Sequence, residues 1–504
     1  MRTRRHTWAA PAAAGGLVLA GLAPAGAAAA GNANNPRKLA QAVEVDAVWE
    51  HLEALQEIAD ANGGNRAAGT SGYEASAEYV EQVLQDAGYE TERQYFPFTY
   101  EEVLASSLVV DGVTYESRIM SYSPNTDGPL TAGLSTPATA TGCSAEEWGE
   151  VDATGTIALV SRGACTFAAK SLAAAAAGAE AVIVYNNAPE PLNGTLGSPD
   201  DGYVPTTGIS GVDGQAMLAA LGEDPGLQAT LEIEVLVEER QTFNVLAETE
   251  AGRDDNVVML GAHLDGAMEG PGINDNGTGS AAILEVAVQL AEVKKLNNTV
   301  RFAWWGAEEV GLVGSWHYVE DLAANDPAGL DEIATYLNFD MVGSPNYVIG
   351  VYDADQSTYE APVDVPEGSA ATEQVFTDYF DSIGQPWVDT EFSGRSDYQP
   401  FIVHGVPASG LFTGADGVKT DEEVAMFGGT AGLAYDPNYH TAEDDLDNVD
   451  GTALEIMSKA IAAATMSLAT DTSEINGKRS AGKSGKPHPA KDAVDAHEVV
   501  PTVA

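Results

Sequence analysis

The chain has 504 residues, 76 acidic side chains against 23 Lys and Arg, and a formal net charge of −53. This length allows two or three domains with substantial cores. Because so acidic a surface repels nucleic acid and anionic membranes, we expect neither as a partner.

The first thirty residues, 1–30, have the pattern of a secretory signal peptide. A basic head of Arg2, Arg4 and Arg5 precedes a short apolar stretch at 9–23, and small residues follow it. The stretch is too short, and too often interrupted by proline and glycine, for a membrane anchor. We therefore expect a secreted, extracellular protein. The arginine pair is compatible with twin-arginine export as well as with the general route.

The next segment, residues 31–126, is predicted to begin the main domain with two helices. Residues 31–40 are interpreted as a linker or the remnant of a propeptide. Apolar side chains recur at helical spacing over 43–61 and again over 71–87, and glycines follow both runs. Residues 96–110 then have the composition of strands.

A change of pattern over residues 127–235 indicates an inserted, β-rich domain. Short β-like runs such as 156–160 and 181–185 alternate with glycine-containing turns. The two cysteines, Cys143 and Cys165, lie in this region. In an exported protein we expect them to form a disulfide, with a pair of buried free thiols as the alternative.

Strand and helix patterns alternate again over residues 236–472. The predicted elements of this part are 243–248, 257–261, 280–295, 299–306, 333–339 and 451–468. This alternation predicts an α/β fold, in which helices cover both faces of a mainly parallel, mixed sheet. Residues 473–504 are rich in Gly, Ser, Lys and Pro, so we expect a disordered tail there.

Polar residues with metal-binding side chains gather where the predicted strands end. The candidates are His263, Asp265, Glu308, Glu309 and Asp340 at strand ends, and Asp275 and His440 in turns. Ligand sites in open α/β sheets lie at the carboxyl ends of the strands, so these segments are expected to converge. Imidazole and carboxylate are ligands that zinc accepts, and there are enough here for two zinc ions that share one carboxylate. Calcium is a second candidate ion, although no D-x-D-x-D-G loop is present.

The adjacent pair Glu308 and Glu309 is the most informative part of this set. Two neighbouring carboxylates do not easily bind the same metal, so one is expected to bind and the other to take a proton from the attacking water. Asp265, two residues after His263, is predicted to orient the imidazole ring. Each residue alone also fits a structural role, such as a core histidine, a helix cap or a solvated turn. Their joint position at strand ends favours the metal site.

Six motifs give the chain a resemblance to a known family. They are Gly-Ala-His-Leu-Asp at 261–265, Gly-Ile-Asn-Asp-Asn-Gly-Thr-Gly at 272–279, Phe-Ala-Trp-Trp-Gly-Ala-Glu-Glu at 302–309, Leu-Asn-Phe-Asp-Met-Val-Gly-Ser-Pro at 337–345, Gly-Arg-Ser-Asp-Tyr at 394–398 and Tyr-Asp-Pro-Asn-Tyr-His at 435–440. With them the chain resembles the secreted bacterial leucyl-type aminopeptidases, which are di-zinc exopeptidases related to aminopeptidase Y. The resemblance covers roughly residues 40–125 and 236–470. The segment between resembles a protease-associated domain, on Cys143 and Arg-Gly-Ala-Cys-Thr-Phe at 162–167.

The resemblance implies a zinc exopeptidase fold and a metal role for five residues. Asp275 would bridge both zinc ions, and His263 and Asp340 would complete one of the two sites. Glu309 and His440 would complete the other site.

Three further residues receive catalytic roles from the resemblance. Glu308 would be the general base. Tyr439 would donate a hydrogen bond to the tetrahedral oxyanion. Arg395 would lie near the substrate.

Two further features of the family, a cis peptide and a local disulfide, concern the same site. Its members often have a cis peptide after the bridging aspartate, here the bond between Asp275 and Asn276. Some close relatives also place a local disulfide around the last histidine ligand, at the positions that are Asn438 and Glu443 in this chain. The loop that carries His440 must therefore be held in another way here.

These features predict a secreted zinc aminopeptidase that removes N-terminal residues from peptides and proteins, with a preference for large apolar residues such as leucine. A carboxypeptidase or dipeptidase of the same superfamily is the main alternative, and there Arg395 would bind the substrate carboxylate. A mono-zinc activity like that of glutaminyl cyclases and a non-catalytic binding module are the others. We expect a monomer in which the inserted domain is a lid.

Overall fold

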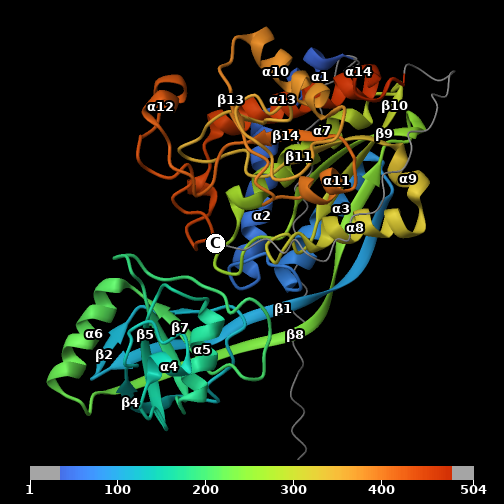
Figure 1. Cartoon of the computed structure of the whole chain (residues 1–504). Coiled ribbons are helices and arrows are strands. Elements are labelled where there is room, and N and C mark those ends of the chain that lie inside the picture. Colours follow the sequence, from blue (N-terminus) through green and yellow to red (C-terminus); the bar gives the residue numbers. More distant parts are fainter. Residues whose placement is uncertain (1–34, 479–504) are drawn as a thin grey trace, which may run out of the picture.

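The computed structural model describes residues 35–478, which form two units joined by a long two-stranded ribbon (Figure 1). The chain leaves the larger unit along β1 (Thr91–Val110) and returns along β8 (Gln228–Glu248). The two strands pair antiparallel from Thr91 opposite Ala247 to Val110 opposite Ala229. One sheet therefore continues from the larger unit into the smaller one.

The larger unit is built on a mixed sheet whose centre is parallel. Its strands lie in the order β13-β12-β14-β11-β9-β10-β8, and parallel pairs join β10, β9, β11 and β14. Their bounds are β9 (Arg253–His263), β10 (Asn298–Trp305), β11 (Ile333–Phe339), β12 (Gly350–Tyr352), β13 (Val388–Thr390) and β14 (Ala408–Phe412). Strands of such a parallel centre are buried on both faces, as β11 is along its whole length.

Helices cover both faces of this sheet because successive side chains of a strand point to opposite sides. Along β9, Val258 and Leu260 belong to one apolar core, and Met259 belongs to the other. The helices of the first core are α1 (Pro36–Ala42), α2 (Val45–Ala61), α3 (Ser71–Ala87), α7 (Thr278–Ala291), α10 (Ser369–Ile383) and α13 (Gly451–Thr470). Those of the second are α8 (Val313–Asn325), α9 (Pro327–Glu332) and α11 (Tyr398–Val403). The predicted fold class is confirmed.

The smaller unit is the predicted β-rich insertion, and Cys143 and Cys165 form the predicted disulfide within it. Its elements after β1 are β2 (Val113–Tyr115), β3 (Arg118–Ile119), β4 (Leu130–Ser135), α4 (Ala145–Trp148), β5 (Thr156–Ser161), α5 (Phe167–Ala176), β6 (Ala181–Tyr185), β7 (Thr206–Ile209) and α6 (Gly211–Glu223). Leu108 and Val110 of β1 pack in its core with residues of β5 and β6. The unit thus includes the end of β1, upstream of residue 127.

The structure departs from the sequence-based expectation at both ends of the larger unit. Helix α1 lies partly in the expected linker, because Leu39 and Ala40 are buried against the core. Residues 473–478, expected to belong to the tail, instead include α14 (Ser473–Asn476), which buries Ile475. The predicted signal peptide and residues 479–504 lie outside the described residues. Over residues 35–478, no helix is both long and apolar enough to cross a membrane.

Candidate metal centre

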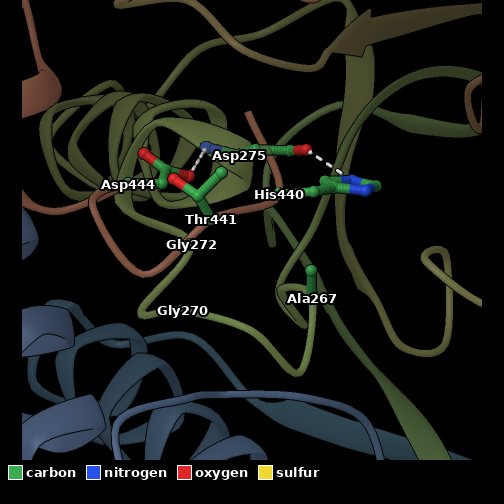
Figure 2. A pocket seen from close by; sticks show the side chains of 7 residues that line it. All are labelled: Ala267, Gly270, Gly272, Asp275, His440, Thr441 and Asp444. Atoms are coloured by element: carbon green, nitrogen blue, oxygen red, sulfur yellow. Dashed lines mark hydrogen bonds and ion pairs between the residues drawn. The ribbon is translucent and has the colours of Figure 1, made fainter. Parts of the chain in front are cut away.

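Two histidines from distant parts of the chain face the two oxygens of one aspartate. Nε2 of His263 lies 3.2 Å from Oδ1 of Asp275, and Nε2 of His440 lies 3.2 Å from Oδ2 of the same carboxylate. His263 is the last residue of β9, whereas His440 lies in a loop without helix or strand. Figure 2 shows the contact between Asp275 and His440. This geometry is that of a carboxylate able to bridge two ions.

Each histidine has a second carboxylate beside it. Oδ1 of Asp340, the residue after β11, lies 3.1 Å from Nε2 of His263. Oε2 of Glu309, close after β10, lies 2.8 Å from Nε2 of His440. The strand ends and the two turns that the sequence singled out therefore meet in one place, and the donor atoms fall into two sets around Asp275.

The turn that carries Asp275 is fixed to the end of β11. The peptide bond between Asp275 and Asn276 is cis. The Asn276 side chain donates to the carbonyl of Phe339 at 2.9 Å and accepts from the main-chain N–H of Met341 at 3.0 Å. These bonds flank Asp340 on both sides, so the bridging carboxylate and Asp340 are held in register.

Asp265 supports the centre through both its main-chain carbonyl and its side-chain carboxylate. Its main-chain carbonyl lies 2.9 Å from Nδ1 of His263, which leaves Nε2 facing the carboxylates. Its carboxylate accepts the main-chain N–H groups of Glu308 and Glu309, at 3.2 and 3.4 Å, and its nearer oxygen is 4.0 Å from Nδ1. Asp265 therefore connects the orientation of the imidazole to the position of the glutamate pair.

Carboxylates outnumber basic side chains in this buried centre. The acidic residues are Asp265, Asp275, Glu308, Glu309, Asp340 and Asp397, and the basic residues are Arg66, His263 and His440. Burial raises the pKa of Glu309 to about 7 and that of Glu308 well above its usual range. Burial opposes the charge on His440, but its ion pairs with Asp275 and Glu309 outweigh this and raise its pKa to about 11.

Such a surplus of buried negative charge is compensated either by protonation, as the raised pKa values of Glu308 and Glu309 indicate, or by bound cations. Oε1 of Glu309 is buried and has no hydrogen-bond partner among the described residues. This carboxylate oxygen is therefore free to bind a metal ion inside the centre. The donor set of imidazole and carboxylate also suits zinc. The residues present therefore fit divalent cations.

A third acidic group lies elsewhere, at Asp353, Asp355 and Glu373. The Asp353 carboxylate accepts main-chain N–H groups of residues 357–359, and Glu373 accepts those of residues 354 and 355. These bonds account for the buried carboxylates of this group without an ion.

Tyr439 and Arg395 lie at the exposed side of the centre. The Tyr439 ring stacks on His440 with ring centroids 3.9 Å apart, and its hydroxyl accepts a long hydrogen bond of 3.4 Å from Arg395. Arg395 also pairs with Asp416 at 3.1 Å. The pocket in Figure 2 is lined in part by Asp275 and His440.

Two supporting residues were not predicted from the sequence. Arg66 is fully buried and donates to the main-chain carbonyls of Leu264, Pro271 and Gly272, in the segment between His263 and Asp275. The Ser396 hydroxyl donates to Oδ2 of Asp340 at 2.6 Å. The partners of Arg66 are carbonyl groups, which have no side-chain signature. Ser396 lies inside the Gly-Arg-Ser-Asp-Tyr motif, and that motif is the only signal for it in the sequence.

Sequence comparison places the chain in a family. It is 44% identical over 462 residues to an aminopeptidase of Pseudomonas aeruginosa, with 88% of this chain and 84% of that protein covered. This chain belongs to peptidase family M28. The model of that family matches residues 244–465, and the model of the PA domain matches residues 126–217. The chain is also 42% identical over 452 residues to the probable leucine aminopeptidase 2 of Aspergillus fumigatus, which covers 88% of this chain and 87% of that protein.

A solved structure supports the same assignment. The fold is similar to that of a zinc aminopeptidase from Bacillus subtilis, with a TM-score of 0.64 and 26% identity, over 86% of this chain and 98% of that chain. The predicted family resemblance is confirmed, as is the predicted enzyme class of metallo-exopeptidase.

Proposed function

We propose that this M28 peptidase is a secreted di-zinc aminopeptidase that prefers large apolar N-terminal residues such as leucine. The observation that carries the proposal is the position of the Asp275 carboxylate, whose oxygens each face a different imidazole at 3.2 Å. His263 and Asp340 would hold one zinc ion with Asp275, and Glu309 and His440 would hold the other. The names of the relatives support the aminopeptidase activity and the leucine preference.

The chemistry is divided between the ions and the side chains. Two zinc ions at these positions would polarise the scissile carbonyl and acidify the attacking water. Glu308 would take a proton from that water and pass it to the leaving amine. Tyr439 would donate a hydrogen bond to the oxygen of the tetrahedral intermediate, and Arg395 would contact the substrate.

An aminopeptidase is favoured over a carboxypeptidase by the charge of the site. The buried carboxylates beside the ions would attract the α-ammonium group of a peptide N-terminus. Arg395, the side chain that would bind a C-terminal carboxylate, is already paired with Asp416. The N-terminal sequence pattern and the disulfide between Cys143 and Cys165 support export.

Hydrolysis of leucyl-p-nitroanilide, with and without a chelator, tests the proposal. We expect turnover that disappears on complete removal of metal and returns with two equivalents of zinc. Activity that survives without metal would contradict it. A peptide with an amidated C-terminus separates the two exopeptidase classes, because an aminopeptidase still cleaves it and a carboxypeptidase does not.

The inserted PA domain is proposed to limit access to the site as a lid, without a ligand of its own. Contacts of β1 support a link between the inserted domain and the metal centre. Phe96, Phe98 and Tyr100 of this strand pack against Ala307, which is next to Glu308. Met268, between His263 and Asp275, contacts the same cluster. Shortening the insertion should raise turnover of long peptides more than that of leucyl-p-nitroanilide.

A further inference from the structure

The loop that carries His440 is closed by two buried aspartates. Asp436 and Asp444 flank the segment and are 1% and 2% exposed, although the His440 side chain between them is 38% exposed. The segment from 436 to 444 contains neither helix nor strand. No regular element therefore fixes His440. Turn bonds such as that from the Thr441 N–H to the Asn438 carbonyl at 3.1 Å shape the loop, and side-chain contacts close it.

Asn448 connects the two aspartates. Its Nδ2 atom lies 3.0 Å from both oxygens of Asp436 and 3.0 Å from Oδ1 of Asp444. Its Oδ1 accepts a hydrogen bond of 2.9 Å from the side chain of Asn438, inside the loop. Because Asn448 is itself 2% exposed, these bonds are shielded from water and strengthened by the charge of the acceptors.

The same two aspartates also hold the turn that carries the bridging residue. Asp444 accepts the main-chain N–H of Asn274 at 2.8 Å and that of Asp275 at 3.0 Å, and the second bond is drawn in Figure 2. Asp436 accepts the side-chain amide of Asn274 at 2.6 Å. Two segments more than 160 residues apart are thereby joined by the same carboxylates.

A buried cation lies beside the same turn. The Arg66 guanidinium donates to the carbonyls of Pro271 and Gly272, which directly precede the turn. Burial lowers the pKa of Arg66 to about 10, and the charge of Asp444 opposes this shift. The turn is thus held between Arg66 and Asp444, and part of the charge of the buried aspartates is balanced.

We propose that Asp436, Asp444 and Asn448 form a clamp that positions His440 against Asp275 and thereby sets the zinc affinity of the position shared by His440, Asp275 and Glu309. The inference rests on the proposed di-zinc function. Outer residues that orient metal ligands typically change metal affinity 10–100-fold when they are replaced.

The test is zinc titration of the full-length protein against a chromophoric chelator of known affinity. In the wild type we expect two zinc ions per chain. Asp444→Asn removes an acceptor for a main-chain N–H, and Asn448→Ala removes the link between the aspartates. In each variant we expect the zinc ion held by His440 to bind about 10–100-fold more weakly. The other ion should lose less affinity, because it shares only Asp275 with the clamp and keeps His263 and Asp340. Glu443→Gln is the matched control, because it removes the same charge from an exposed neighbour of Asp444 and should leave both affinities unchanged.

Three outcomes separate the clamp from the proposed function. Wild-type protein that binds fewer than two zinc ions, or binds two and does not hydrolyse leucyl-p-nitroanilide, would contradict the proposed function. Wild-type protein that binds two and hydrolyses the substrate, with variants that bind both ions as tightly, would overturn the clamp alone. If circular dichroism shows that Asp444→Asn does not fold, Asn448→Ala carries the test, since it leaves the bonds from both aspartates to residues 274 and 275 in place.

Discussion

The carboxylate of Asp265 accepts a hydrogen bond of 3.2 Å from the main-chain N–H of Glu308, although 43 positions separate the two residues in the chain. The main-chain carbonyl of Asp265 also contacts Nδ1 of His263. One buried aspartate thus fixes both a proposed zinc ligand and the proposed base, so its removal should affect metal binding and proton transfer together.

We predict that Asp265→Ala lowers both zinc affinity and kcat. Zinc affinity should fall by about 10–100-fold, the usual effect of an outer residue that orients ligands. The kcat of the variant at saturating zinc should remain below that of the wild type, because Glu308 loses its main-chain anchor. Asp265→Asn, which keeps one acceptor oxygen, should give an intermediate value. Full recovery of kcat by added zinc would limit Asp265 to a role in metal binding.

We predict that Glu308→Gln keeps zinc and loses activity. The amide cannot accept the proton of the attacking water, so kcat for leucyl-p-nitroanilide should fall by about 10²–10⁴-fold. Metal analysis of the purified variant should still give two zinc ions per chain, because the proposed ligand is the neighbouring Glu309. Glu269→Gln, at an exposed position in the same region, is the control and should match the wild type. Unchanged turnover in Glu308→Gln would exclude Glu308 as the base.

The metal-free protein should lose stability as the pH rises. Burial raises the folded-state pKa of Glu309 and Asp397 to about 7, and ion pairs raise that of His440 to about 11. In each case the folded state binds more protons than the unfolded state, so the free energy of unfolding falls with pH. The carboxyl contributions are present below their unfolded pKa values near 4 and are lost as the pH approaches about 7.

Thermal unfolding at pH 5 to 9 with and without zinc tests this dependence. The Tm of the metal-free protein should fall across the range. Zinc should raise the Tm more at high pH, because binding displaces protons from groups such as His440. The difference between the two forms isolates the centre, since groups outside it contribute to both. A zinc-induced increase in Tm that is the same at every pH would contradict the prediction that zinc displaces protons from His440 and its neighbours.

The sequence predicted the parts of this site that depend on strand ends. His263, Glu308 and Asp340 follow buried apolar strands, and the shared edge of a parallel sheet brings such positions together. The ribbon was harder to predict, because β1 pairs with a strand more than 100 residues later and nothing local encodes that partner. The boundary of the inserted unit and the role of Leu108 in its core follow from this pairing.

The supporting contacts were not predictable for a different reason. Arg66 bonds only to main-chain carbonyls among the described residues, and any residue type presents these. Asp436 and Asp444 could be read from the sequence as solvated acids in a chain with 76 acidic residues. Their function depends on burial, which pattern alone does not show for isolated polar residues in a loop.

We predict that Arg66→Ala destabilises the metal-free protein by roughly 3–5 kcal/mol, because it leaves buried carbonyls without a donor and buried carboxylates without their cation. Arg66→Lys keeps the charge but not the planar set of donors that reaches Leu264, Pro271 and Gly272 together, so it should recover only part of this loss. Urea unfolding in the presence of a chelator measures both. Arg118→Ala, at an exposed ion pair in the inserted unit, should change stability by no more than about 0.5 kcal/mol. If Arg66→Lys is as stable as the wild type, charge alone is sufficient at this position and the directed bonds to the turn do not contribute.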